Sequence, residues 1–462
     1  MGTKYSFDCL MRLLTMNSFK YITFISFQII LIGQSFGQIT YNLNECIEIA
    51  LESKKTLFSA ELDVISAEKG VVGSKSGYLP SLNLSASTGR TQFPELNSVN
   101  YDLNNLSSDT TQINHTNNMS AGLSLNQTIY NGGRTRNTVK QAKSNLNIAQ
   151  LSQRQTRIQV ILNVVKSYYG LLQAQQLLDV AENNLDLSNQ QVSLVQQKFE
   201  LGAVRKTDLL KAEVAKGQGR VDVLNRKTML ENARRELFNN MGMLDFGQSI
   251  SAVAEEWTEV IVPSTSDALN YLKTKNPSLL TQEARVVLSG LQIQLTKGLR
   301  LPSVGASMSY GANGENSDAL LDAIKDEWTL GMNVSISLPI YSGNSLSIQQ
   351  QQAKLAQQKI KNDYITYLND LKVQVEFLRK SLMNYSEIIP INKEVVVSAN
   401  EDLKLVKKRY SLGSASILEV LDAQVSLIRT KSTLINSIHE ARIQETNLKA
   451  LLGILDLDYK VE

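Results

Sequence analysis

The sequence is poor in the residues that build disulfide frameworks, metal sites and hydrolytic centres. Its 462 residues include two cysteines, Cys9 and Cys46, and two histidines, His115 and His439. Two isolated cysteines give neither a disulfide framework nor the spacing of a zinc site. The dinucleotide, P-loop, zinc-protease and serine-hydrolase motifs are all missing from the sequence. We therefore predict a protein that is not an enzyme and that carries no cofactor and no metal.

The sequence also has a small net charge and few prolines. Lys plus Arg total 47 and Asp plus Glu total 44, which leaves a net charge of +3 and gives no indication of a nucleic-acid partner. The seven prolines, with abundant Gln, Asn, Leu, Ser and Ala, favour long helices with polar surfaces over a compact α/β enzyme.

The first residues have the pattern of a secretory signal. After Lys20 comes an apolar stretch, 21–33, and then small and polar residues up to Gln38. This design predicts a cleaved signal peptide that ends near Gly37, with Met16 as an alternative start. The competing interpretation is a membrane-spanning helix. The stretch is shorter than the ~20 apolar residues that such a helix needs. Cys46 lies outside a lipidation context, so we predict no acyl anchor on the exported chain.

The same motif occurs twice in the chain. KFELGAVRKTDLLKAE starts at Lys198 and RYSLGSASILEVLDAQ starts at Arg409, an offset of 211 residues. At the same offset, IYNG at 129–132 aligns with IYSG at 340–343, and QAK at 141–143 aligns with QAK at 352–354. One offset shared by three motifs indicates an internal duplication.

The duplication divides the predicted chain into five parts. We expect a signal peptide (1–37), a first repeat (38–246), a linker (247–263), a second repeat (264–455) and a C-terminal tail (456–462). In the first repeat we expect a strand pair at about 79–131 and a helical hairpin at about 132–242. In the second repeat we expect a strand pair at about 301–341 and a helical hairpin at about 342–453.

Apolar and small polar residues alternate in four stretches, 82–88, 119–129, 304–310 and 328–338. A period of two predicts strands with one apolar and one polar face, about as long as strands that cross a bilayer obliquely. We expect polar loops at 94–117 and 311–327 to join them in pairs. A soluble four-stranded sheet fits the alternation equally well. If the strands face lipid, several copies must pool them, because open sheet edges are not tolerated there.

Helical periodicity follows each strand pair for nearly seventy residues. Apolar positions recur with heptad spacing from Ala174 to Phe199 and, 211 residues later, from Tyr385 to Tyr410. Heptads predict coiled-coil packing, and a helix from about Gly133 to Phe199 would be roughly 100 Å long. Pro390 interrupts the second helix and predicts a kink there.

Each copy of the repeated motif is predicted to be the turn of a helical hairpin. Gly202 and Gly413 are placed as glycines that end one helix, and Thr207 and Ser416 are the possible N-caps of the next. Acidic residues recur in the first turns of the returning helices, which the helix dipole favours. We interpret His439 as a residue of the helix surface.

These motifs, in this order and doubled, resemble the TolC family of outer-membrane efflux proteins over about residues 40–453. The resemblance implies an α+β membrane protein that forms a homotrimer. Each protomer would give four antiparallel strands to a 12-stranded outer-membrane β-barrel and coiled-coil helices to an α-helical barrel in the periplasm. It implies the outer membrane of a Gram-negative bacterium as location and outer-membrane lipid as surroundings. It further implies a periplasmic adaptor protein and an inner-membrane pump of RND, ABC or MFS type as partners.

The resemblance also assigns the site residues. In the family, a carboxylate and a phenol at the positions of Asp208 and Tyr410 hold neighbouring hairpins together, and Glu419 and Asp422 match acidic rings at the narrowest point. Ala415 stands where well-studied members have an Arg, and Arg205 is a candidate substitute. The expected adaptor-docking tips are the residues of the two turns: Leu201, Gly202, Ala203, Leu412, Gly413 and Ser414.

The sequence leaves three functions to be tested. The first is a passive exit duct of a tripartite efflux system. The second, with the same architecture, is the exit duct of a type I protein-secretion system. The third is a soluble periplasmic coiled-coil scaffold without a channel.

Overall fold

The computed structural model describes residues 39–102, 107–243, 250–252 and 261–459. The predicted signal peptide, Cys9, most of the predicted linker and the end of the predicted tail lie outside the described residues.

The described elements occur in two parallel series. The first runs β1 (Ile39–Tyr41), α2 (Leu43–Ser53), α3 (Lys55–Ser74), η1 (Lys75–Tyr78), β2 (Ser81–Asp102), β3 (Ser107–Asn131), α4 (Arg134–Glu200) and α5 (Lys206–Met241). The second runs β4 (Ile250–Ala252), α6 (Thr265–Lys275), α7 (Pro277–Gly298), β5 (Ser303–Gly314), α8 (Ser317–Asp326), β6 (Thr329–Ser337), α9 (Ser345–Ser411), α10 (Ile417–Leu452) and η2 (Leu455–Leu457). Apart from η1, η2 and α8, each element of one series has its counterpart in the other.

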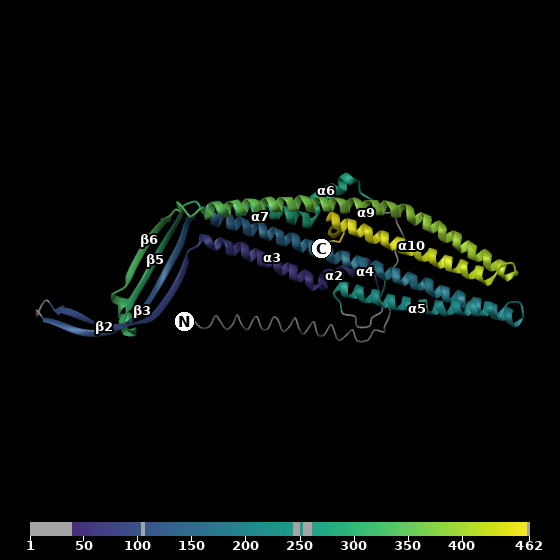
Figure 1. Cartoon of the computed structure of the whole chain (residues 1–462), viewed down its shortest axis with the longest axis horizontal. Coiled ribbons are helices and arrows are strands. Elements are labelled where there is room, and N and C mark those ends of the chain that lie inside the picture. The colour runs from purple at the N-terminus through teal and green to yellow at the C-terminus, as the bar shows by residue number, and fades with distance from the viewer. Residues whose placement is uncertain (1–38, 103–106, 244–249, 253–260, 460–462) are drawn as a thin grey trace, which may run out of the picture.

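Helices α4 and α9 determine the shape of the molecule. Each contains 67 residues, which corresponds to roughly 100 Å at 1.5 Å per residue. Figure 1 shows an elongated helical body with the sheet at one end and the α4–α5 and α9–α10 turns at the other. In the part of the chain that the structure describes, no helix has the length and apolarity needed to cross a membrane.

The helices pack side by side along this body. α5 returns along α4, α10 returns along α9, and α4 also contacts α10, so the two hairpins are joined within one chain. The shorter helices α3 and α7 pack along the part of α4 nearer the sheet, and α7 also packs against α9. The sequence did not indicate α3 and α7 individually.

Four strands form one antiparallel sheet in the order β2-β3-β5-β6. Its register aligns the apolar positions across neighbouring strands: Leu84 pairs with Leu123, Leu123 with Tyr310, and Tyr310 with Leu330. The intervening positions carry Ser, Asn, Gly and Thr, as at Ser85, Gly122 and Gly311. The predicted division into one apolar and one uncharged polar face is therefore confirmed for the part of the sheet in which all four strands pair.

Both predicted polar loops are corrected by the structure. Most of 94–117 continues the hairpin, and β2 pairs with β3 past a bulge at Gln92/Leu96 out to Asp102 and Ser107. Backbone pairing does not need an apolar face in water, so a run of Ser, Thr and Asn was misinterpreted as a loop. The second loop, 311–327, holds the end of β5 and the helix α8.

Close to the middle of the helical body, the chain builds its largest apolar core. Cys46, Ile47, Ile161, Tyr168, Leu237 and Phe238 are almost fully buried there. Burial raises the pKa of the Cys46 thiol to about 12, so this cysteine is an enclosed core residue. The parallel pair β1–β4 joins the start of the first repeat to the predicted linker at this level, a contact that the sequence did not predict.

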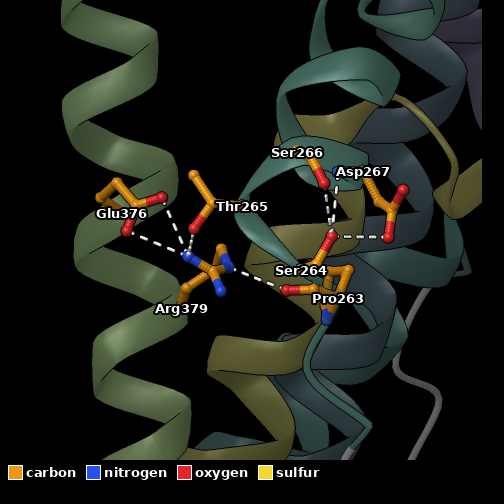
Figure 2. Close-up of polar contacts among 7 residues, drawn as sticks. All are labelled: Pro263, Ser264, Thr265, Ser266, Asp267, Glu376 and Arg379. Atoms are coloured by element: carbon orange, nitrogen blue, oxygen red, sulfur yellow. Dashed lines mark hydrogen bonds and ion pairs between the residues drawn. The ribbon is translucent and has the colours of Figure 1, made fainter.

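Polar clamps hold the segments at this level against the long helices. Arg379 of α9 donates to the carbonyl of Pro263 at 2.8 Å and bonds to Thr265, at the start of α6 (Figure 2). Glu376, one turn earlier on α9, holds the same guanidinium at 2.9 and 3.0 Å. Arg154 of α4 bonds to the Lys275 carbonyl at the end of α6 at 3.1 Å and pairs with Asp456 at 2.8 Å.

Helix α9 is continuous through Pro390. Figure 1 shows α9 curving over its second half toward the turn. A local kink at the proline stays a prediction.

Candidate functional site

The two turns at the tip of the molecule have the same backbone geometry. Gly202 has φ +73° and Gly413 has φ +80°, a left-handed conformation that favours glycine. In each turn the next residue donates its N–H back to the helix, from Ala203 to the Lys198 carbonyl and from Ser414 to the Arg409 carbonyl. This is the hydrogen bond expected of a C-terminal glycine cap, so the repeated Leu-Gly forms the same turn twice.

The two returning helices begin with different caps. The Ser416 hydroxyl accepts the N–H of Glu419 at 3.3 Å, and the Glu419 carboxylate accepts the N–H of Ser416 at 2.9 Å, a reciprocal capping box. The first copy was wrongly predicted to be capped by Thr207. Its helix starts at Lys206, and Asp208 accepts the N–H of Arg205 at 3.4 Å.

A shared apolar cluster packs the two turns against each other. Leu209 and Ala212 of α5, Val195 of α4, and Val406, Ile417 and Val420 from the second hairpin are buried in it. The two tips of one protomer are thus one packed unit.

Tyr410 lies in this tip cluster with 5% of its surface exposed. Its hydroxyl is buried and has no hydrogen-bond partner within the described protomer. Lys198 lies 4.4 Å from the ring centroid and donates to the Tyr410 carbonyl at 2.9 Å. Burial raises the pKa of Tyr410, and the negative charge of Asp208 raises it further. The structure therefore brings Asp208 and Tyr410 to the same tip without joining them by a hydrogen bond.

The two predicted entrance acids differ in their surroundings. Glu419 is occupied: it accepts from the Ser416 N–H and hydroxyl and lies 3.6 Å from Arg409. The hydrogen bonds to Ser416 lower the pKa of Glu419, and Arg409 lowers it further. Asp422, one turn along on α10, is exposed and makes no hydrogen bond or ion pair among the described residues. Of the two carboxylates, Asp422 is the one free to act on ions in solution.

The six turn residues predicted to dock an adaptor are all exposed at the extreme end of the helical body. The Leu201 side chain is 84% exposed and the Leu412 side chain is 75% exposed. The two leucines occupy the same position in the two repeats, so each turn carries one exposed apolar side chain.

Ala415 packs partly buried against the tip cluster. Arg205 makes no ion pair within the described protomer, so the structure gives no support to Arg205 as a substitute for the missing Arg. The cation nearest an entrance acid is instead Arg409, which pairs with Glu419.

Polar side chains line the contact between α4 and α10, and sequence reasoning missed them. The Gln424 side-chain amide donates to Asn184 Oδ1 at 2.6 Å and to Ser188 Oγ at 3.1 Å, and Gln173 donates to Asn436 at 2.9 Å. Polar residues at heptad core positions, of which Ser188 is one, were the available signal.

His439 belongs to the same contact and corrects the surface interpretation. It is 4% exposed, lies 2.9 Å from Gln176 Oε1 and packs beside Tyr169. Burial lowers the pKa of His439 to about 4, so the ring is neutral at physiological pH.

Near the tip, α5 and α10 border a groove of about 580 Å³ with a mostly apolar lining. Its exposed apolar side chains are Leu210, Val214, Leu418 and Val425, and Asn184 and Ser188 of α4 also line it.

Comparison with known proteins connects both ends of the molecule to one family. Residues 46–243 and 268–454 match the family model of the outer membrane efflux proteins. The chain is 25% identical over 428 residues to the outer membrane protein TolC of Escherichia coli strain K12, covering 90% of this chain and 83% of TolC. It is 24% identical over 348 residues to the cation efflux system protein CusC of the same strain, covering 72% of each.

Solved structures show the same fold. A crystal structure of CusC superposes with a TM-score of 0.78 at 20% identity and covers 92% of this chain and 95% of that one. The outer membrane channel CmeC of Campylobacter jejuni superposes with a TM-score of 0.77 at 18% identity, covering 89% and 86%.

Proposed function

Because this chain belongs to the outer membrane efflux protein family, we propose that it is an outer-membrane channel and the passive exit duct of a tripartite efflux system. Its task is conduction, and it performs no chemistry of its own. The observation that carries the proposal is the joining of two unlike parts in one chain. A sheet with one apolar and one uncharged polar face continues into a helical body roughly 100 Å long.

The functional channel is a homotrimer. The outer strands of the sheet are β2 and β6, and their free edges need partners in lipid because unpaired backbone groups are costly there. Pairing β6 of one copy with β2 of the next closes a barrel, and three copies of a four-stranded sheet supply twelve strands.

The internal repeat supports the same arrangement along the helices. Within one chain, α4 contacts α10 through pairs such as Gln173–Asn436. The counterparts 211 residues away are Asn384 on α9 and Asn225 on α5, and both are exposed in the protomer. Beside Asn384, α9 exposes Ile388, Ile391 and Val395. An α9–α5 contact between neighbouring copies would cover these apolar side chains and repeat the internal contact around the ring.

The tips form the periplasmic entrance. Threefold symmetry would place three Asp422 carboxylates, and three Glu419 carboxylates around them, near the axis, where they concentrate negative potential. Asp208 and Tyr410 are the latch residues in this proposal, since the Asp208 charge already acts on the phenol.

The turns and the groove between α5 and α10 dock a periplasmic adaptor, which connects the duct to an inner-membrane pump. The exposed Leu201 and Leu412 and the apolar groove residues are the surface that the adaptor covers. The two turns have the same backbone, so an adaptor can engage both repeats in one manner.

Two experiments test this function. The purified chain should require detergent for extraction and should conduct ions across a planar bilayer. Extraction without detergent, together with silent bilayers, would favour the soluble scaffold.

Photo-crosslinking in cells from probes at Ala203 and Ser414 identifies the partners. An adaptor among the products supports docking at the tips, and the pump that works with that adaptor distinguishes efflux from type I protein secretion. Crosslinks between copies of this chain alone would count against adaptor docking at these turns.

A further inference from the structure

Helix α8 has no counterpart in the first repeat, and it lies on the apolar face of the sheet. Tyr310 belongs to that face, and its hydroxyl donates to the Ile324 carbonyl of α8 at 2.9 Å. Ala312, two residues further on the same face, is only 3% exposed because α8 covers it. A Cβ at Gly314 would collide with the backbone of Ala319 and Leu320, so the helix approaches the strand as closely as glycine allows.

The helix has two unlike sides. Asp318, Asp322 and Asp326 recur every four residues and form one exposed acidic stripe. Ala323 is buried against the sheet, and Leu320 and Ile324 are half-buried. Leu321 points away from Ala323 on the helix and is 56% exposed. Such a helix suits a boundary between water and an apolar phase.

An aromatic pair lies next to α8. The rings of Tyr310 and Trp328 are 5.6 Å apart, and Trp328 is 49% exposed on the side of the sheet that carries the apolar residues. Tyrosine and tryptophan gather where a membrane meets water, since their rings are amphipathic.

The length of the sheet also agrees with a position of α8 at the boundary between membrane and water. Strand β6 has 9 residues, which is about 30 Å of strand and about 23 Å of height at the usual barrel tilt, close to the ~25 Å apolar band of such barrels. The band therefore runs from the helical body to Trp328 and ends at α8. Strands β2 and β3 continue beyond it, and Figure 1 shows this hairpin extending past β5 and β6.

We infer that α8 is an interfacial helix that rests in the lipid headgroup layer around the outer rim of the barrel. The inference rests on the proposed membrane channel, because it needs the apolar sheet face to contact lipid. The occupant of the exposed side of α8 is lipid, since the helix lies on the outer end of the sheet's apolar face, next to the exposed ring of Trp328. Its charges place it at the headgroups, because a charged side chain on a lipid-facing surface is more costly at mid-bilayer than at the interface.

Depth-dependent fluorescence quenching tests this placement in the exported chain, from which cleavage of the predicted signal peptide removes Cys9. Leu321→Cys carries an environment-sensitive fluorophore, and the unsubstituted chain gives the labelling blank, since Cys46 is buried. The labelled protein is reconstituted in phosphatidylcholine vesicles with nitroxide either on the headgroup or near the end of the acyl chain. We expect the headgroup nitroxide to quench residue 321 roughly twofold more strongly than the deep one.

Two matched positions separate the outcomes. Met332→Cys, on the apolar face and 74% exposed, should be quenched most by the deep nitroxide. Thr91→Cys, on the extension of β2, should respond only to aqueous iodide. If Met332 also escapes the deep nitroxide, the barrel proposal itself fails.

If the deep nitroxide quenches residue 332 most, three results at residue 321 decide whether α8 is an interfacial helix. Quenching by headgroup nitroxide supports the interfacial helix. Quenching by iodide alone overturns it in favour of a helix in water, and protection from all quenchers overturns it in favour of contact with a neighbouring copy. A double substitution, Asp318→Leu with Asp322→Leu, adds a directional check. Replacing two of the three acids of the stripe should shift residue 321 toward the deep nitroxide if lipid borders the helix, and an unchanged quenching ratio would count against lipid contact.

Discussion

At the scale of single residues, the two entrance acids are distinguished by their partners. The Glu419 carboxylate accepts a hydrogen bond from Ser416 and forms an ion pair with Arg409, whereas the Asp422 carboxylate makes neither among the described residues. A free exposed carboxylate is a better site for a passing cation than one that already accepts hydrogen bonds. The acidic stretch of the sequence therefore contains one residue that caps a helix and one residue whose carboxylate is free among the described residues.

We expect Asp422→Asn to weaken the block of the reconstituted channel by divalent or trivalent cations more than Glu419→Gln does. The double substitution Glu419→Ala with Asp422→Ala should weaken it most. Single-channel recordings at increasing cation concentration measure the half-blocking concentration of each variant. Unchanged block in the double variant would remove both residues from the entrance.

His439 gives the α4–α10 contact a pH dependence. Burial lowers its pKa to about 4, below the ordinary value of 6.5, so the unfolded chain binds the proton more readily between these values. Stability from this residue is therefore complete above pH 6.5 and is lost as the pH falls toward 4, by about 2–3 kcal/mol per chain.

We expect the wild-type chain to lose more thermal stability than His439→Gln between about pH 7 and about pH 4.5. The thermal midpoint of the helical circular dichroism signal, followed against pH, provides the measurement. Parallel pH profiles for the two proteins would show that the imidazole does not titrate in this contact.

At the scale of elements, the sequence predicted what its periodicity and end signals encode. The heptads from Ala174 to Phe199 lie within α4. Gly202 and Gly413 form turns because the backbone there has the left-handed conformation that favours glycine. Of the two possible N-caps named from the sequence, Ser416 is confirmed, because its hydroxyl accepts the Glu419 N–H, and Thr207 is not the cap of α5. Each of these signals acts within a few residues along the chain.

Elements that depend on partners distant in sequence were harder to predict. The outer half of β2 and β3 is held by backbone pairing across the hairpin and carries no alternation to announce it. His439 is a polar residue on a helix, and its burial is decided by Gln176 and Tyr169 on another helix. The free carboxylate of Asp422 was likewise invisible, since it depends on Arg409 and Ser416 engaging Glu419 instead.

Replacing two glycines of the first hairpin by alanine should change its stability in opposite directions. Gly202 has φ +73°, so Gly202→Ala should destabilise the hairpin by about 1 kcal/mol. Gly170 is helical within α4, and a Cβ there meets no atom within 4 Å, so Gly170→Ala should stabilise by about 0.5–1 kcal/mol. Thermal midpoints of the two variants should move in opposite directions, and a shared direction would contradict the assigned turn geometry.

At the scale of the whole molecule, one protomer is an open structure. Among the described residues, its sheet ends in two unpaired edges, and α9 and α5 expose apolar residues such as Ile391 and Leu224 that no other described segment covers. The duplication explains why: each repeat supplies one hairpin, and one chain contains only one of the two kinds of contact that a closed ring of hairpins needs. Closing both the sheet and the ring of helices requires further copies of the same chain.

The internal contact therefore serves as a template for the contact between copies. Asn225→Cys with Asn384→Cys should be joined by a short bis-maleimide between neighbouring protomers, and denaturing gels should show covalent dimers and trimers. In the matched control, Gln173→Cys with Asn436→Cys, the two residues contact each other within one chain, so the product should keep the mass of a monomer. Cys46 is buried and adds no background, and cleavage of the predicted signal peptide removes Cys9. Monomer mass for both pairs, in a sample that still conducts ions, would show that neighbouring copies do not repeat the α4–α10 contact.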